Sequence, residues 1–211
     1  MGNLKQSIFA GIFSIFTIGV LTALTYKTEL GVFIIASFGS SMVLLFGYPE
    51  SPFAQPKNVF FGHLLTAVVG IFSICTIGVL TALTYKTELG IFIIASFGSS
   101  MVLLFGYPES PFAQPKNVFF GHLLTALVGM FFLHFVPLPL FIIIPLAVGF
   151  GVGLMILFNV THPPAGGNPI IVIIGSVSID FLLSPVISGS IIIIIFAIVV
   201  NRLILKKKYP G

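Results

Sequence analysis

The chain has 211 residues, of which 57% are hydrophobic and only 7% are charged, and its mean hydropathy is +1.20. Soluble globular domains carry about 25% charged residues, so this composition excludes an ordinary soluble protein and predicts an integral membrane protein. The formal net charge of +4 comes largely from the C-terminal residues 202–208, and it therefore bears on orientation in a membrane rather than on nucleic-acid binding.

The apolar stretches predict a series of membrane segments, because a helix needs about 20 apolar residues to cross a bilayer. In chain order they are 8–25, 31–46, 59–83, 90–105, 118–135, 140–158, 170–183 and 186–205. Segment 170–183 is too short for a comfortable crossing and 31–46 and 90–105 are marginal, so each of these three is expected as a short or half-membrane helix. The predicted fold class is an all-α, polytopic helical bundle with short or broken helices flanking proline-rich turns.

Basic residues predict the orientation of these segments. With the N-terminus in the cytoplasm, the outside segments hold only Lys27 and Lys86. The inside segments hold Lys5, Lys57, Lys116, Arg202, Lys206, Lys207 and Lys208. Positive charge collects on the cytoplasmic side of membrane proteins, so both termini are predicted to lie inside, in a lipid bilayer that we expect to be a bacterial inner (plasma) membrane.

An internal repeat occupies much of the chain. Residues 11–70 and 70–129 match at an offset of 59 and differ at only three positions, 16/75, 32/91 and 68/127. The inverted repeats of transporters show only weak symmetry, so near-identity indicates a recent tandem duplication or an error in assembling the underlying sequence. The predicted organisation is a first copy at 11–69, a second copy at 70–128 and C-terminal helices at 129–211.

The stretch Thr161–Pro169, which reads Thr-His-Pro-Pro-Ala-Gly-Gly-Asn-Pro, interrupts two apolar runs. Its prolines remove backbone donors and disfavour the α conformation in the residue before each, so a continuous helix is not expected. At membrane depth, such a break survives only where protein or a water-filled cavity satisfies its backbone groups. The polar side chains beside it, His162 and Asn168, are therefore the first candidates for a functional site.

Two further proline-rich turns, 47–58 and 106–117, fall on the same predicted side as the break at 159–169. All three follow a Leu-Phe-Gly or Leu-Phe-Asn helix end, and each carries prolines, an alanine and an asparagine. This weak similarity suggests that a copy of the turn and the break face each other in a paired site.

Three blocks in order resemble the HPP family of small integral membrane proteins: residues 95–100, residues 110–117 with Gly121-His122, and residues 162–169. The first two blocks also stand in the earlier copy, at 36–41 and 51–58 with Gly62-His63. The resemblance covers nearly the whole chain and implies a single compact domain over 1–211, usually with four transmembrane helices. It also implies a suspected transport role, since plastid and cyanobacterial members are associated with nitrite. The extra 59 residues depart from the family, and the second copy, contiguous with the C-terminal half, is expected to be the functional one.

The residues themselves suit a small anion. Helices that open at Val118 and Ile170, directly after the two interruptions, would point their partly positive N-termini into one vestibule. Lys116 adds a positive charge and His162 a titratable one, while the predicted spans hold a single acidic residue, Asp180, near the end of 170–183. The sequence thus predicts a transporter or channel-like permease for a small inorganic anion, with nitrite as the expected example.

The candidate substrate site comprises His162, Pro163, Pro164, Asn168, Gln114, Asn117, Lys116, Ser99, Ser100 and His122. Each part also has a purely structural interpretation. His162 can cap a helix or bond a carbonyl, His122 can hydrogen-bond between helices, and the serines can serve close helix packing. Lys116 can lie in a solvated loop.

Other functional classes have less support. The chain has no His-Glu-x-x-His, no Gly-x-Ser-x-Gly and no close pair of carboxylates within the spans, so no enzyme activity is expected. His122 and His162 alone are too few ligands for a metal site, and no cofactor is expected. The alternative to transport is a membrane anchor, scaffold or regulatory module, and a homo-oligomer is a further hypothesis.

Overall fold

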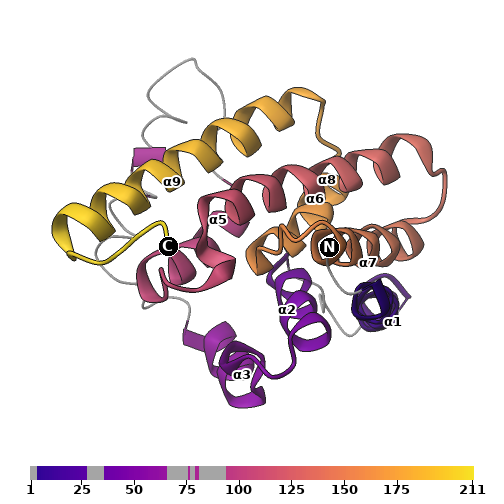
Figure 1. The fold of residues 1–211 in the computed structure, drawn as a ribbon. Helices are drawn as coiled ribbons and strands as arrows, with labels where there is room; N and C mark the ends of the chain where they lie inside the picture. Colours follow the sequence, from indigo (N-terminus) through magenta and orange to yellow (C-terminus); the bar gives the residue numbers. More distant parts are fainter. Residues whose placement is uncertain (1–3, 28–35, 66–75, 77–78, 81–93) are drawn as a thin grey trace.

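The computed structural model describes residues 4–27, 36–65, 76, 79–80 and 94–211, drawn in colour in Figure 1. Its α-helices are α1 (Leu4–Lys27), α2 (Ala36–Gly47), α3 (Pro56–Leu65), α5 (Ala95–Met101), α6 (Pro115–Phe135), α7 (Leu140–Leu157), α8 (Asn168–Gly175) and α9 (Ser188–Val199). Short 3₁₀ turns are η1 (Pro52–Ala54), η3 (Pro111–Ala113) and η4 (Pro163–Gly167), and π-helical turns are η2 (Val102–Gly106), η5 (Leu182–Ile187) and η6 (Val200–Ile204).

Within this described part, four helices are long and apolar enough to cross a membrane: α1, α6, α7 and the run Leu182–Ile204, which is kinked at the non-helical Ser184. Two shorter apolar helices, Phe38–Gly47 and Ala95–Gly106, accompany them. Large side chains on the outer faces, such as Phe16 on α1 and Phe135 on α6, are exposed, as lipid contact requires. The predicted fold class, a helical membrane bundle with short helices, is confirmed.

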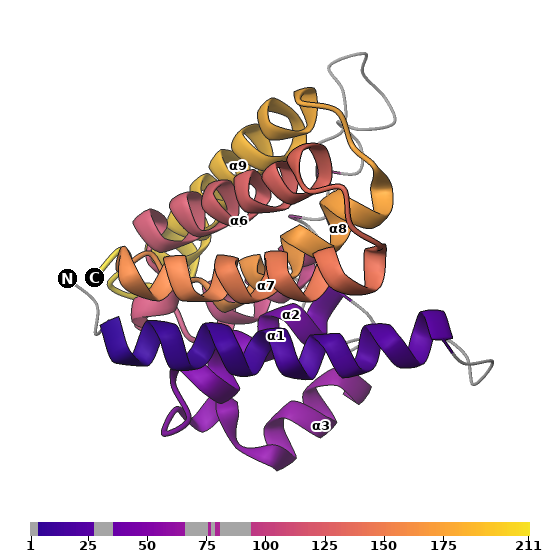
Figure 2. The same cartoon turned by 90° about the vertical axis from the view of Figure 1, so that its right-hand side faces the viewer.

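The helices α1 and α7 run side by side along the bundle (Figure 2). Glycines allow this close approach, because a Cβ added to Gly149 would lie 2.6 Å from the Gly11 carbonyl oxygen. On its other faces α7 packs against α6 and α8, and Ile144, Val148, Val152 and Met155 are fully buried there. This apolar layer is the core on which the break rests.

The break turns the chain back toward the middle of the bundle. After α7, Asn159 takes a left-handed φ of 53°, which ends the helix, and η4 then leads directly into α8. Pro163 and Pro164 open η4, where their missing N–H groups are not needed. The stretch expected to be irregular is therefore a 3₁₀ turn, and α8 starts at Asn168 rather than at Ile170.

Segment 170–183 forms a half-membrane helix, one of the two forms expected for it. Ser176, with a left-handed φ of 44°, ends α8. At 1.5 Å per residue, α8 is about 12 Å long, well short of the roughly 30 Å apolar layer of a bilayer. The predicted end at residue 183 is wrong, because α8 already ends at Gly175.

The start of α1 and the C-terminal residues lie at one end of the bundle (Figure 2). The Gln6 side chain donates to the Gly47 carbonyl, Tyr209 donates to the Ala113 carbonyl at 2.8 Å, and the Gly211 N–H donates to the Gln114 side chain at 2.9 Å. Burial raises the pKa of the Tyr209 phenol. The turns after α2 and η2 thus share an end with both termini, in agreement with the predicted arrangement.

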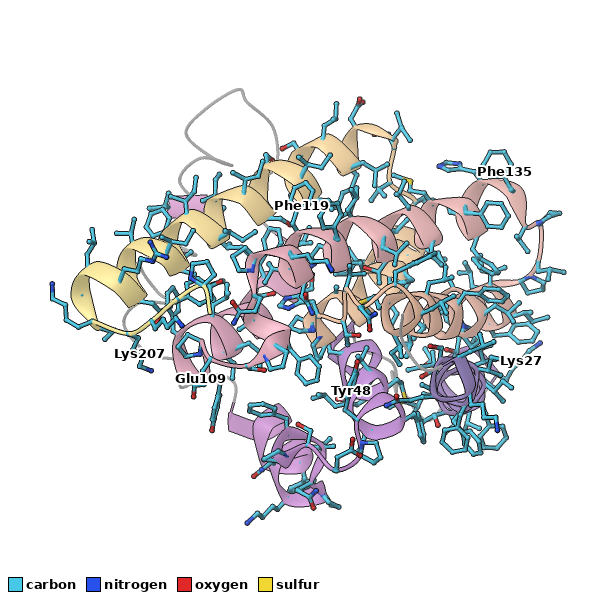
Figure 3. All side chains as sticks on the ribbon, in the orientation of Figure 1. Lys27, Tyr48, Glu109, Phe119, Phe135 and Lys207 are labelled. Atoms are coloured by element: carbon cyan, nitrogen blue, oxygen red, sulfur yellow. The ribbon has the colours of Figure 1, made fainter. Side chains whose placement is uncertain are left out.

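Figure 3 places Glu109 and Lys207 on the side of the molecule opposite Lys27 and Phe135. Which of these sides faces the cytoplasm stays a prediction. The predicted segment 59–83 begins within α3, but most of it, including residues 66–75 and 81–83, lies outside the described residues, as do residues 31–35 and 90–93 of two further segments and Lys86.

Candidate functional site

The turn η4 lies at the meeting point of several elements. α2 and α5, the corresponding short helices of the two repeat copies, both contact it, as do α6, α7 and α8. Its residues 163–167 are all buried, so its backbone is enclosed by protein. This satisfies the condition for irregular backbone at membrane depth.

Two histidines lie beside this turn and are joined through one serine. The Ser100 hydroxyl lies 2.8 Å from His162 Nε2 and 3.1 Å from His122 Nε2. The imidazole centroids are 4.9 Å apart, and the Phe97 ring packs edge-on against His122 at 5.0 Å. The other ring nitrogen of His162, Nδ1, lies 2.7 Å from the Phe112 carbonyl oxygen.

Asn168 extends the chain of polar groups on the far side of His122. Its amide nitrogen lies 3.1 Å from each of three acceptors, which are His122 Nδ1, the His122 carbonyl oxygen and Thr125 Oγ1. Its amide oxygen accepts a hydrogen bond of 2.7 Å from the Ser96 hydroxyl. We call Ser96, Ser100, His122, Asn168 and His162 the histidine chain.

The direction of the hydrogen bonds in this chain follows from one carbonyl. The Phe112 oxygen can only accept, so Nδ1 of His162 carries a hydrogen and, in a neutral ring, Nε2 is an acceptor. Ser100 therefore donates to His162 and accepts from Nε2–H of His122. Nδ1 of His122 is then the acceptor for the Asn168 amide. Every bond has one donor and one acceptor when both histidines are neutral.

The whole histidine chain is shielded from the surroundings. His122, His162, Asn168 and Ser100 are 0% exposed and Ser96 is 4% exposed. Buried polar groups are costly unless they are paired, and here each of these side chains has a partner. The described residues contain no group of three or more histidine, cysteine or acidic side chains suited to a metal.

Glycines bring the elements close enough for these bonds. A Cβ added to Gly121 on α6 would lie 2.8 Å from His162 Cβ and 3.0 Å from the Val160 carbonyl oxygen. On the other side, a Cβ added to Gly39 on α2 would lie 2.7 Å from the Gly166 carbonyl carbon. The break is thus held between two glycine surfaces, one from each copy.

Some residues predicted for the site lie at its edge or away from it. Asn117 donates a bond of 2.9 Å to the Thr161 carbonyl, so it touches the break but not the histidines. Gln114 donates to the Pro108 and Ser110 carbonyls of its own turn, both at 3.0 Å. These side chains support the backbone that places His162.

Other predicted residues make no bond to the histidines. Lys116 is exposed, and Ser99 is half-buried beside Ser100. Pro163 and Pro164 shape η4, and the Pro164 carbonyl accepts a bond of 3.0 Å from Ser40 of the first copy. Of the ten predicted residues, the structure joins His122, His162, Asn168 and Ser100 directly.

Sequence reasoning left out Ser96, Thr125 and the Phe112 carbonyl. Ser96 lies one helical turn before Ser100, and Thr125 lies three residues after His122, so each shares a helix face with a predicted site residue. That spacing is the signal that finds them. The Phe112 carbonyl has no sequence signal, because any residue presents one.

The comparisons with known proteins agree with this architecture. The family described as "HPP, transmembrane region" matches residues 1–76 and again residues 70–210. Two transmembrane proteins of Dictyostelium discoideum are similar to the chain. One is 36% identical over 56% of this chain and 44% of its own length, and the other 34% identical over 57% and 41%. The chain thus spans less than half the length of these relatives, and no solved structure matches.

The first family match ends at residue 76 and the second begins at residue 70, close to the junction of the two repeat copies. The second match runs from the second copy through the break, and it contains the whole histidine chain. This confirms the resemblance found in the sequence: the chain belongs to the HPP transmembrane-region family.

Proposed function

We propose that this protein transports a small monovalent inorganic anion, with nitrite as the expected substrate, and that the histidine chain lies on the path. The observation that carries the proposal is the burial of two ionisable side chains, joined by a serine, inside an apolar membrane bundle. Ionisable residues are expensive at this depth and usually mark a substrate, ion or proton pathway.

The charge around the histidine chain favours an anion over a cation. Helix α6 begins at Pro115, two residues after the end of η3, and α8 begins at Asn168, which is itself a member of the histidine chain. Helix N-termini carry about half a positive charge and unpaired N–H groups. None of the described acidic side chains, Glu50, Glu109 and Asp180, bonds to the histidine chain, so negative charge does not compete there.

The end of the bundle near the break supplies an approach for an anion. Lys116 is exposed there, one residue before Asn117, which holds the Thr161 carbonyl. An anion attracted by Lys116 meets the break next, and the buried histidines after it. Entry requires a rearrangement, because the histidines have no exposed surface in this conformation.

The proposal is tested by anion uptake into proteoliposomes, over a panel that includes nitrite, nitrate, chloride and bicarbonate. We expect uptake above that of protein-free vesicles, and a loss of about tenfold or more in two variants: His162→Asn removes an ionisable ring from the proposed path, and Asn168→Ala leaves buried groups unpaired. Insertion is followed by size-exclusion chromatography in detergent. Equal uptake by the wild type, both variants and protein-free vesicles contradicts the proposal.

A non-transport membrane module is the second candidate, because one observation favours it. The histidine chain satisfies its own hydrogen bonds completely, as a network that only fixes helix positions would. For an anchor, scaffold or regulatory module, folded wild-type protein gives no anion flux, and His162→Asn lowers thermal stability alone. A flux in the wild type that His162→Asn lowers more than it lowers thermal stability favours transport over a non-transport module.

We further propose that both termini face the cytoplasm, as the basic residues indicate. Single cysteines at Lys5, Lys207 and Leu138, placed in a Cys75→Ser background, are labelled in intact cells with an impermeant maleimide. Leu138 lies in the connection after α6, whose end at Phe135 is opposite Lys207 (Figure 3), so only this position is expected to react. The same cells show whether the chain resides in a bacterial plasma membrane.

A further inference from the structure

The Ser100 hydroxyl has a second acceptor besides His162. Its oxygen lies 2.8 Å from His162 Nε2 and 3.2 Å from the Ser96 carbonyl oxygen. A hydroxyl has one hydrogen, which rotates to suit its partners. Ser100 can therefore donate to either acceptor without any movement of a heavier atom.

These two positions of one hydrogen correspond to two protonation states of His162. In the neutral state Ser100 donates to His162 Nε2. When Nε2 gains a proton, the Ser100 hydrogen turns to the Ser96 carbonyl, and the Ser100 oxygen accepts from both histidines. The bond from Nδ1–H to the Phe112 carbonyl is kept in both states. The site accepts a proton from water with every hydrogen bond still made.

His122 cannot take the proton in the same way. Its Nδ1 accepts from the Asn168 amide nitrogen, and a hydrogen on Nδ1 would point at that donor. Turning the Asn168 amide over would place its oxygen 3.1 Å from the His122 carbonyl oxygen and would break the bond from Ser96. The environment therefore directs the proton to His162.

The groups around His162 carry no charge of their own. His122 faces it from α6, Ser100 from α5 and the Phe112 carbonyl from η3. From the turn after α2, Tyr48 reaches the neighbouring Thr161 hydroxyl at 3.1 Å. An added proton thus leaves one uncompensated positive charge in a buried site, which is costly until a negative charge arrives.

We propose that His162 binds one proton together with each transported anion, so that the protein is a proton–anion symporter with Ser100 as the switch between the neutral and protonated sites. The inference rests on the proposed function, because the transported anion supplies the compensating charge. The cargo is then electrically neutral overall, and the site is empty and neutral after release.

The test measures nitrite and proton movements together in proteoliposomes. An internal pH dye follows protons, a valinomycin–potassium clamp sets the membrane potential, and protein-free vesicles correct for permeation of nitrous acid. We expect one proton to enter with each nitrite, uptake driven by a pH gradient, and no response to the potential. Uptake that follows the potential and ignores the pH gradient overturns the inference and leaves the proposed function standing. No uptake overturns both.

Matched histidine variants assign the proton to one ring. His162→Asn keeps a donor for the Phe112 carbonyl but cannot bind a proton, so we expect the residual nitrite uptake to bring no proton with it. His122→Gln keeps a donor for Ser100, and we expect residual uptake to retain one proton for each nitrite. The opposite pattern, with coupling lost in His122→Gln and kept in His162→Asn, contradicts the assignment.

A spectroscopic measurement covers the case in which a variant fails to fold. Solid-state ¹⁵N spectra of wild-type protein in lipid are recorded with and without nitrite. The His162 signals are assigned by sequential correlation, or by comparison with the fraction of His162→Asn protein that inserts. We expect one imidazole to become doubly protonated when nitrite is added. Spectra in which every buried imidazole stays neutral at saturating nitrite overturn the inference.

Discussion

The two repeat copies have the same sequence in the turn after their short helix, and this turn has the same structure in both. Ser51 and Ser110 begin it with φ, ψ of −63°, 138° and −61°, 138°. Each serine oxygen accepts from the N–H two residues later, at 3.3 Å and 3.2 Å. The turn is thus determined by its own residues, a serine cap followed by proline.

The short helices before these turns are also identical in sequence, but they pack in different ways. α2 lies on η4 through Gly39, with Ser40 donating to the Pro164 carbonyl. In α5 the corresponding Gly98 has nothing within 4 Å of an added Cβ, and the helix meets the break through Ser96 and Ser100 instead.

This helix therefore has two usable faces, one of glycine and serine and one of two serines. Residues one position apart differ by about 100° around a helix, so both faces cannot meet the same partner. Sequence determines that each face is small and polar enough to pack closely. The surrounding helices determine which face is used.

The largest effect on stability is expected when the corresponding glycines of the two short helices, Gly39 and Gly98, are substituted. Gly39→Ala places a methyl group 2.7 Å from the Gly166 carbonyl carbon, so we expect a loss of about 3 kcal/mol or more in stability. Gly98→Ala, the same substitution in the other copy, meets open space, and alanine favours a helix by about 1 kcal/mol over glycine. Thermal unfolding in detergent compares the two. Equal stabilities would show that α2 does not rest on the break.

The histidines of the two copies provide the next test. His122 bonds to Ser100 and Asn168, so His122→Ala removes one partner from each and interrupts the histidine chain between them, and it is expected to lower anion uptake about tenfold or more. His63 is its equivalent in the first copy, and His63→Ala is expected to leave uptake unchanged. Uptake is measured at matched protein amounts. A larger loss in His63→Ala would assign the site to the first copy.

The sequence predicts the long helices well, because apolar length is a local property. The predicted spans 8–25, 118–135 and 140–158 lie within three or four residues of the ends of α1, α6 and α7. The sequence also predicts the break, since three prolines within nine residues prevent one continuous α-helix. The short apolar run after the break likewise predicts that α8 spans only part of the bilayer.

The site was harder to predict because it depends on tertiary packing. His162 and Asn168 stand beside the break in sequence and in space. Gln114 and Lys116 were expected with them as polar residues near a helix start, but the first bonds to its own turn and the second is exposed. Sequence does not show which polar side chains hydrogen-bond within their own turn and which reach another element.

A smaller effect is expected at Asn201, which hydrogen-bonds to the segment where the two copies differ a second time. Residues 102–106 form a π turn, whereas the same five residues continue as α-helix in the first copy. The Leu104 carbonyl would face Pro108, which has no N–H, and Asn201 donates to it at 2.8 Å. Asn201→Leu removes this bond and also the unpaired amide oxygen, so we expect stability to fall by about 1 kcal/mol. A loss above 3 kcal/mol would mean that the π turn depends on Asn201 far more than one bond allows.

The smallest expected effect on activity comes from removing the second copy, residues 70–128. The joined chain keeps Ser37, Ser41 and His63 in place of Ser96, Ser100 and His122, so we expect it to insert and to retain uptake. Failure to insert would show that the duplication is structural.

The same deletion is expected to change the oligomeric state. In the full chain the two turns pack reciprocally: Tyr48 lies edge-on to Phe112 at 4.7 Å, and Tyr107 lies edge-on to Phe53 at 4.6 Å. Such exchange of equivalent partners is the pattern of a twofold interface between identical subunits. A single-copy chain leaves its turn without that partner, and a second molecule can supply it. We expect light scattering in detergent to show a dimer. Phe53→Ala is expected to dissociate it, because a symmetric contact contains the Tyr48–Phe53 pair twice and the substitution removes both. A monomer as stable as the full chain would show that the two turns meet only because they are tethered.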